Sequence, residues 1–166
     1  MNLSPSKRSL KRNEVLTDYG QTEHHIYFIY EGAVCAFYAG EEEEKVIRFG
    51  YKGSIINALP SFFSGNPSEI QIRAIRASIY TPISRIVLQE FIYQKTENQE
   101  LYTSLLEGLC VQQMEREIDL LTPSPVDRIE RVRKRSPQVF QEIPLKYIAS
   151  YLRMSPETLS RLNRKS

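Results

Sequence analysis

The first half of the chain alternates short apolar runs with turns that are marked by Gly, Asp and Pro. The runs are rich in β-branched and aromatic residues, and the run from Ile70 to Ile75 mostly alternates with polar residues. Many short strands at near-regular spacing are typical of a β-sandwich or jelly roll. We expect residues 1–13 to be flexible, because Ser, Pro and basic residues are frequent there. The expected strands are residues 15–16, 26–30, 33–38, 45–49, 70–75 and 84–88.

The hydrophobic period becomes helical between residues 97 and 121. Leucines first recur at four-residue spacing, and later apolar residues step by three, four and three positions, as in a coiled-coil seam. A helix packed against its own β domain is one interpretation, which suits the N-terminal half. The later spacing favours a parallel dimer helix. The predicted dimer seam consists of Val111, Met114, Ile118 and Leu121.

Two prolines stop this helix, and Ser124 between them is placed to cap the next one. We expect a basic helix at residues 126–135 that turns Ile129 and Val132 inward. A Ser-Pro pair ends that helix, and a short link at residues 138–142 follows.

Residues 143–165, IPLKYIASYLRMSPETLSRLNRK, predict two short helices around a tight turn. Pro144 suits the first position of the first helix, since it lacks the N–H that would be unpaired there. Ser155 is placed to cap the second helix, with Pro156 as its first residue and Glu157 near its positive end. The inward apolar stripes are Tyr147, Ile148, Tyr151 and Leu152 in the first helix and Leu159 and Leu162 in the second.

This layout predicts a helix-turn-helix, whose second helix enters the major groove of DNA. Arg can bond guanine bidentately, Glu can accept from cytosine, and Ser or Thr can bind phosphate. A helical hairpin that only closes a core is the alternative. The order of cap, proline, acid and arginine between two apolar stripes favours the DNA-binding motif. The predicted DNA contacts are Ser155, Glu157, Thr158, Ser160, Arg161 and Arg164.

The C-terminal segment resembles the DNA-reading end of transcription regulators of the cyclic-AMP receptor protein/Fnr family, most of all a branch whose chains end soon after the recognition helix. YFIYEGAVCAFYAG and residues 53–77 resemble the sensor barrel of that family, so the resemblance covers most of the chain. It implies an α+β fold: a double-stranded β-helix (jelly-roll) sensor barrel at 1–96, a dimerisation helix at 97–122 and a helix-turn-helix domain at 123–166. The implied two-fold symmetry would set two recognition helices about 34 Å apart.

The chain departs from the family pattern in its short lead before the first strand and in lacking room for a β-hairpin wing. Arg153 stands in the turn where the family usually has Gly. We therefore expect a left-handed backbone at Arg153, at a cost of roughly 1 kcal/mol unless the turn is rebuilt.

The net charge of +2 hides an asymmetry between the two ends of the chain. Residues 126–166 hold 10 Lys and Arg against 4 Asp and Glu, whereas residues 1–125 hold 12 against 16. A basic end on an acidic body is the electrostatic footprint of a nucleic-acid reader. A merely solvated tail is the alternative, which the helix-turn-helix within the basic part disfavours.

The nucleotide pocket of the family corresponds to residues 53–77. The family places a Glu early in that segment for the ribose and an Arg-Ser or Arg-Thr pair for the phosphate. Here those positions hold Ala58, Ser68 and Glu69, and a carboxylate repels a phosphate. We expect no cAMP binding in the family manner, which leaves another ligand, for example an uncharged one, or none. The candidate effector-pocket residues are Ile55, Ala58, Ser68 and Glu69.

Other candidate chemistry is weak. The acidic run 41–44 is interpreted as a solvated loop and His24-His25 as a turn, with a metal site as the alternative for each. Cys35 and Cys110 are expected to be buried thiols, and two cysteines cannot supply a four-cysteine iron–sulfur site. We therefore expect no cofactor and no metal. No apolar run suggests a membrane span or a secretory signal, which favours the cytoplasm.

The leading function is sequence-specific DNA binding as a homodimer, on a palindromic operator, with RNA polymerase as a further candidate partner and an unknown small-molecule effector. The chain is not expected to be an enzyme. A cupin-like barrel enzyme, or a small-molecule or metal sensor that acts through protein contacts, is the alternative. A barrel that binds a protein partner is a third hypothesis.

Overall fold

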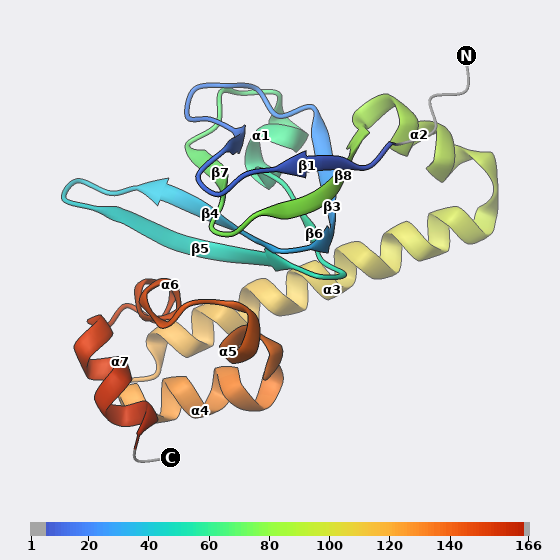
Figure 1. Cartoon of the computed structure of the whole chain (residues 1–166). Coiled ribbons are helices and arrows are strands. Elements are labelled where there is room, and N and C mark those ends of the chain that lie inside the picture. Colours follow the sequence, from blue (N-terminus) through green and yellow to red (C-terminus); the bar gives the residue numbers. More distant parts are fainter. Residues whose placement is uncertain (1–5, 165–166) are drawn as a thin grey trace. The chain divides into compact units, whose positions relative to one another are not determined.

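The computed structural model describes residues 6–164, which divide into two compact units at Arg85 and Ile86. The first unit contains the strands and one short helix (Figure 1). Its elements are β1 Arg8–Leu10, β2 Val15–Thr17, β3 His25–Glu31, β4 Ala33–Ala39, β5 Glu44–Tyr51, β6 Ile55–Ile56, α1 Leu59–Ser64, β7 Ile70–Ala74 and β8 Ser78–Ser84.

The strands of the first unit form an antiparallel β-sandwich. One four-stranded sheet has the order β1-β8-β3-β6 and the other the order β2-β7-β4-β5. Alternate residues of the strands meet between the sheets, where Ile29, Val34 and Ile72 are fully buried in one apolar cluster. The predicted β-sandwich and α+β class are therefore confirmed.

Three local expectations for the first unit are wrong. Residues 8–10 are not flexible but form β1, which pairs with β8 because Leu10 is buried in the core. His25 is not part of a turn, since it begins β3. Residues 86–88 are helical rather than extended. In a short apolar run, periodicity does not distinguish a buried strand from a helix. Residues 1–5 lie outside the described residues.

The second unit is helical. Its elements are α2 Arg85–Gln94, which starts one residue before the division, α3 Thr96–Leu121, α4 Pro125–Arg135, α5 Gln138–Glu142, α6 Leu145–Tyr151 and α7 Pro156–Asn163. The predicted long helix, basic helix and final pair of helices are all present. The expected link at 138–142 is instead the short helix α5, because Val139 is buried and draws the segment into the core. Pro144 precedes α6, which begins at Leu145.

Inward positions of the last helices agree in part with the predicted stripes, since Tyr147, Tyr151 and Leu162 are only half-buried. Ile129 and Val132 of α4 are buried, and Ile148, Leu152 and Leu159 are fully buried. Cys35 is buried as expected, but Cys110 is exposed on α3, which corrects the expectation of a buried thiol. Within residues 6–164, no helix combines the length and apolar character that a bilayer crossing requires.

Candidate nucleic-acid interface

Helix α7 is built around its own N-terminal cap. The Ser155 hydroxyl oxygen accepts a hydrogen bond from the Thr158 backbone N–H at 3.1 Å, and Pro156 occupies the first turn. Glu157 lies in the same turn, where a carboxylate is favoured by the positive end of the helix. Leu159 is fully buried, so the face opposite to it is turned outward. The sequence prediction of this cap is confirmed.

The outward face of α7 carries most of the predicted contacts. Glu157, Arg161 and Arg164 are exposed, whereas Thr158 and Ser160 are half-buried. Arg164 donates to the Ser160 backbone oxygen at 3.4 Å and to its hydroxyl at 3.3 Å. Within residues 6–164, no hydrogen bond or ion pair engages the Arg161 guanidinium or the Glu157 carboxylate. Both groups are therefore available to an external partner.

The turn between α6 and α7 uses a left-handed residue. Arg153 has φ +56°, as predicted for the position that holds Gly in the family that the sequence resembles. The Met154 backbone N–H returns to the Ala149 carbonyl oxygen at 3.0 Å, which closes the turn against the end of α6. Only four residues, 152–155, connect α6 to α7.

Arginines of α4 hold the last helices in place. Arg128 donates to the Leu152 carbonyl oxygen at 2.8 Å, at the end of α6. Arg133 donates to the Asn163 side-chain oxygen at 2.6 Å, at the end of α7, and its guanidinium lies over the Phe140 ring. These arginines therefore serve the packing of the unit rather than an external anion.

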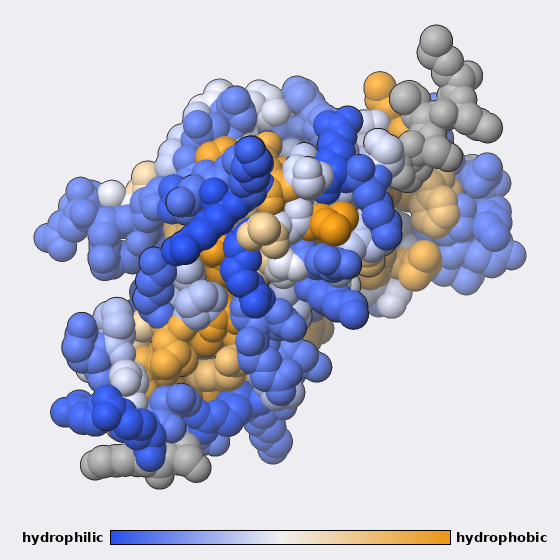
Figure 2. Space-filling view, viewed as in Figure 1, coloured by the Kyte–Doolittle hydropathy of each residue, from blue (hydrophilic) through white to orange (hydrophobic). Residues whose placement is uncertain are grey.

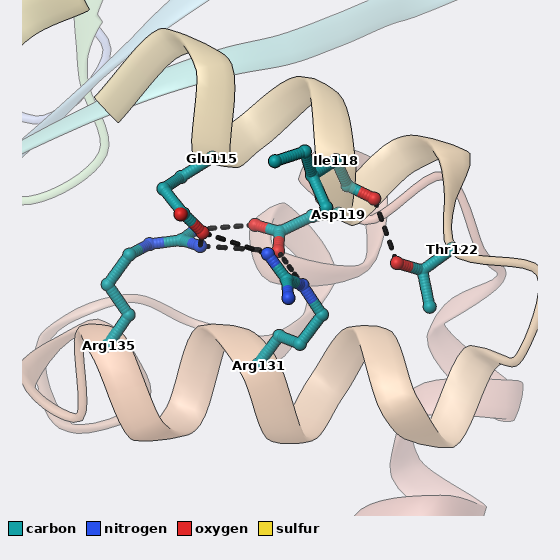
Figure 3. A network of polar contacts seen from close by, with 6 residues as sticks. All are labelled: Glu115, Ile118, Asp119, Thr122, Arg131 and Arg135. Carbon is teal, nitrogen blue, oxygen red and sulfur yellow. Dashed lines mark hydrogen bonds and ion pairs between the residues drawn. The ribbon is translucent and has the colours of Figure 1, made fainter. Parts of the chain in front are cut away.

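A second set of arginines joins α4 to α3 (Figure 3). Arg131 donates to Asp119 at 2.9 Å and to Glu115 at 2.8 Å. Arg135 donates to Glu115 and to one oxygen of Asp119 at 3.2 Å each, and pairs with the other Asp119 oxygen. The Asp119 carboxylate raises the pKa of Arg135 by accepting its hydrogen bonds. Sequence reasoning missed Asp119, since a lone carboxylate in a helix carries no visible signal.

The basic charge of this region thus divides into two groups. Arg128, Arg131, Arg133 and Arg135 are committed to contacts within the unit. Among the described residues 126–164, the exposed cations are Lys134, Lys146, Arg153, Arg161 and Arg164. The sequence count therefore overstates the charge that the region can present to a polyanion.

The predicted dimer seam lies uncovered on α3. Val111 is 63% exposed, Met114 57%, Ile118 42% and Leu121 72%. Such an apolar row at coiled-coil spacing leaves a large water-exposed surface on an isolated chain. Figure 2 shows other apolar surface, in orange, among the blue hydrophilic surface. Ile86, Phe91 and Tyr93 of α2 are also exposed.

The candidate effector-pocket residues lie at β6 and before β7. Ala58 is fully buried and Ile55 is 38% exposed. The buried Ser68 hydroxyl donates to the Ile70 carbonyl oxygen at 2.7 Å and accepts from the Ile70 N–H at 3.0 Å. Glu69 is exposed, so its position does not support the expected repulsion from within the barrel. The absence of an Arg at position 68, by contrast, follows from the sequence and does not depend on side-chain position.

A buried carboxylate in the first unit was not anticipated. Glu23 is 2% exposed and accepts hydrogen bonds from the Tyr27 hydroxyl at 3.1 Å, the His25 N–H at 2.9 Å and the Thr17 hydroxyl. Its own N–H donates to the hydroxyl of Ser61, a residue of α1, at 2.9 Å. Burial raises the pKa of Tyr27, which therefore stays a hydroxyl donor. Among residues 6–164, no three His, Cys, Asp or Glu side chains are arranged to hold a metal ion.

Comparison with known proteins gives a family match to the barrel. The model of the cyclic nucleotide-binding domain matches residues 7–95. Among curated proteins, no sequence match was found.

Solved structures match over nearly the whole chain. FixK2 from Bradyrhizobium japonicum superposes with a TM-score of 0.81 at 16% identity, covering 98% of this chain and 84% of that one. A CooA mutant from Carboxydothermus hydrogenoformans gives 0.72 at 13% identity, covering 97% and 75%. CLP, a c-di-GMP-responsive global regulator from Xanthomonas campestris, gives 0.63 at 17% identity, covering 97% and 86%. At such low identity these likenesses show a shared fold.

Proposed function

Because this chain belongs to the cyclic nucleotide-binding domain family and its structural neighbours are Crp/Fnr-family regulators, we propose that it is a homodimeric transcription regulator that binds a specific DNA sequence. The observation that carries the proposal is the outward face of α7. This face combines a capped N-terminus with the exposed Glu157 and Arg161 side chains, which have no hydrogen-bond or ion-pair partner among residues 6–164. Arg133 of α4 donates to Asn163 at the end of the same helix.

In this proposal α6 and α7 form a helix-turn-helix, and α7 enters the major groove. Arg161 contacts a guanine and Glu157 helps to select the base, since they lie four residues apart on the outer face. The remaining contacts go to phosphates and fix the register of the helix on the duplex. These contacts come from Ser155, Thr158, Ser160 and Arg164.

The dimer is proposed to form through α3. A parallel pair of these helices would cover Val111, Met114, Ile118 and Leu121, which are exposed in the single chain. The two-fold axis would place two α7 helices about 34 Å apart and so require a palindromic operator. The division into a barrel at 1–96, a dimer helix at 97–122 and a DNA-binding domain at 123–166 belongs to the same proposal.

The barrel is proposed to serve as a sensor whose effector is not cAMP. Position 58 holds Ala rather than a carboxylate for the ribose, and position 68 holds Ser rather than a guanidinium for the phosphate. RNA polymerase is a further candidate partner, and a role on the chromosome would place the protein in the cytoplasm. A cupin-like enzyme or metal sensor is not favoured, because the structural neighbours are transcription regulators.

The decisive experiment is selection of duplexes from a random DNA library with the purified full chain, followed by gel shifts in rising salt. We expect enrichment of a palindrome and a steep fall of affinity with salt, since phosphate contacts release counterions. Native mass spectrometry of the same sample reports the dimer and any retained ligand. The proposal would be rejected if no sequence is enriched, or if the DNA affinity does not change with salt concentration.

A further inference from the structure

We infer that the ion-pair cluster between α3 and α4 is a positioning device that fixes the angle of the recognition helix relative to the dimer helix, and thereby the half-site spacing that the dimer accepts. The cluster, here called the arginine latch, consists of Glu115, Asp119, Arg131 and Arg135. The inference rests on the proposed DNA-binding function and deepens it.

The latch is closed on a buried anion. The Asp119 side chain is 1% exposed, and both of its oxygens are engaged by the guanidinium groups of Arg131 and Arg135. Glu115, one turn earlier on α3, bridges the same two arginines, at 2.8 Å and 3.2 Å (Figure 3). A buried carboxylate without its cations is strongly disfavoured, so a rotation of α4 away from α3 is resisted.

The latch lies far from the α3–α4 connection, and it therefore constrains the angle between these two helices. Only Thr122, Pro123 and Ser124 connect α3 to α4, and a short connection fixes the distance between helix ends but not their direction. Arg135 is the last residue of α4, about 15 Å along the helix axis from Pro125. A contact so far from the pivot fixes the direction of α4 much better than one beside it.

The fixed direction of α4 is passed on to α7. Arg128 holds the end of α6 at Leu152, and Arg133 holds the end of α7 at Asn163. Arginines of one helix therefore contact α3 on one side and the final helices on the other. Any change in the α3–α4 angle would carry α7 with it.

From the sequence alone, Arg131 and Arg135 could equally be phosphate contacts. A phosphate contact and a latch contact predict different dependence of DNA affinity on salt. Loss of a phosphate contact on each subunit would make the salt slope of binding shallower by about 2 for the dimer. Loss of a latch contact leaves the slope unchanged. Lys134 provides the matched control, since it lies between the latch residues in sequence, is exposed and has no ion-pair partner within residues 6–164.

The test uses the palindrome recovered from the random library and two derivatives with one base pair added to or removed from its centre. We expect Asp119→Asn and Arg135→Gln each to weaken binding to the selected site by about 2- to 30-fold, with the salt slope retained. Both variants should also lose much of the preference for the native spacing. The loss in the double variant should be smaller than the sum of the two single losses, because the two side chains contact each other. Arg135→Lys and Glu115→Gln are gentler variants should Asp119→Asn fail to fold.

A second arm needs no DNA. Spin labels at Gln113 on α3 and Arg161 on α7, in a Cys110→Ser background and diluted with unlabelled chain, report the distance between the two helices. We expect a narrow distribution that broadens with Asp119→Asn and is unaffected by Lys134→Gln. Unchanged spacing preference together with an unchanged distribution would overturn the latch, as would a shallower salt slope for Arg135→Gln. Broadening in a protein that enriches no DNA would instead reject the proposed function and leave the latch standing.

Discussion

Arg153 makes two hydrogen bonds to the same acceptor, the carbonyl oxygen of Ser150. Its backbone N–H and its guanidinium each donate to that oxygen at 3.2 Å. The residue does so with φ +56°, a conformation that L side chains adopt at a cost. The Arg153 side chain thus compensates in part for the strain that its own backbone carries, by capping a carbonyl at the end of α6.

Replacement of Arg153 by Gly should stabilise the free protein, by up to roughly 1 kcal/mol, because Gly adopts φ > 0 without strain. The gain is reduced by the lost guanidinium hydrogen bond, which is exposed and therefore weak. Arg153→Ala is the matched control, since it keeps the strain but loses the hydrogen bond, and should destabilise. Chemical denaturation measures both. DNA binding of the Gly variant should weaken slightly through the lost charge, and a destabilised Gly variant would contradict this account of the turn.

Replacement of Arg161 by Ala should weaken binding to the selected DNA site by ~1–3 kcal/mol and relax specificity at one base position. The reason is that Arg161 is exposed on the outer face of α7 and its guanidinium makes no hydrogen bond or ion pair among residues 6–164. Lys134→Ala should instead weaken specific and random DNA alike. Gel shifts on both kinds of duplex measure the difference. Equal losses for Arg161→Ala would show that it binds only phosphate.

Replacement of Met114 and Ile118 by Glu should convert the dimer to a monomer that binds DNA weakly. Both side chains lie in the exposed apolar row of α3, and charges there would be buried without partners on association. Gln113→Glu, at an exposed polar position of the same helix, is the control and should remain dimeric. Light scattering gives the mass. A double variant that is still dimeric would point to an interface on the barrel.

Cyclic AMP and cyclic GMP should neither bind tightly nor change DNA affinity. The position that would supply a guanidinium is Ser68, whose hydroxyl is occupied by the backbone of Ile70. The position that would supply a ribose acceptor is the buried Ala58. Without the bidentate anchor the phosphate has no strong partner there. Calorimetry at millimolar nucleotide is the test, and a micromolar dissociation constant would mean that Arg73 or Arg76 has taken over the anion.

Cys35 should resist alkylation in the folded protein. Burial raises the pKa of this thiol, so it remains protonated at pH values where an ordinary cysteine forms the reactive thiolate. Mass spectrometry after iodoacetamide treatment at pH 8.5 should find Cys35 unmodified, and modified once the chain is unfolded in urea. Rapid labelling of Cys35 under native conditions would show that its strand opens easily.

Much of the candidate interface was predictable because its determinants are local. The cap at Ser155, the proline that follows it and the left-handed turn at Arg153 each depend on a few neighbouring residues. The seam on α3 follows from helical periodicity alone, so its exposure could be anticipated before any fold was known.

The sequence by itself determined the β-rich first half, the long helix, the two helices around the turn and the outward position of Arg161, but not β1, α2 or α5. Tertiary structure alone decided which charges are available, because ion pairs form between residues that are distant in the chain. Asp119 meets Arg131 and Arg135 across two helices, and Glu23 is buried against Thr17 and Tyr27. Likewise β1 exists only because β8 pairs with it. Periodicity shows which face of an element is buried, but it does not show which partner that face will meet.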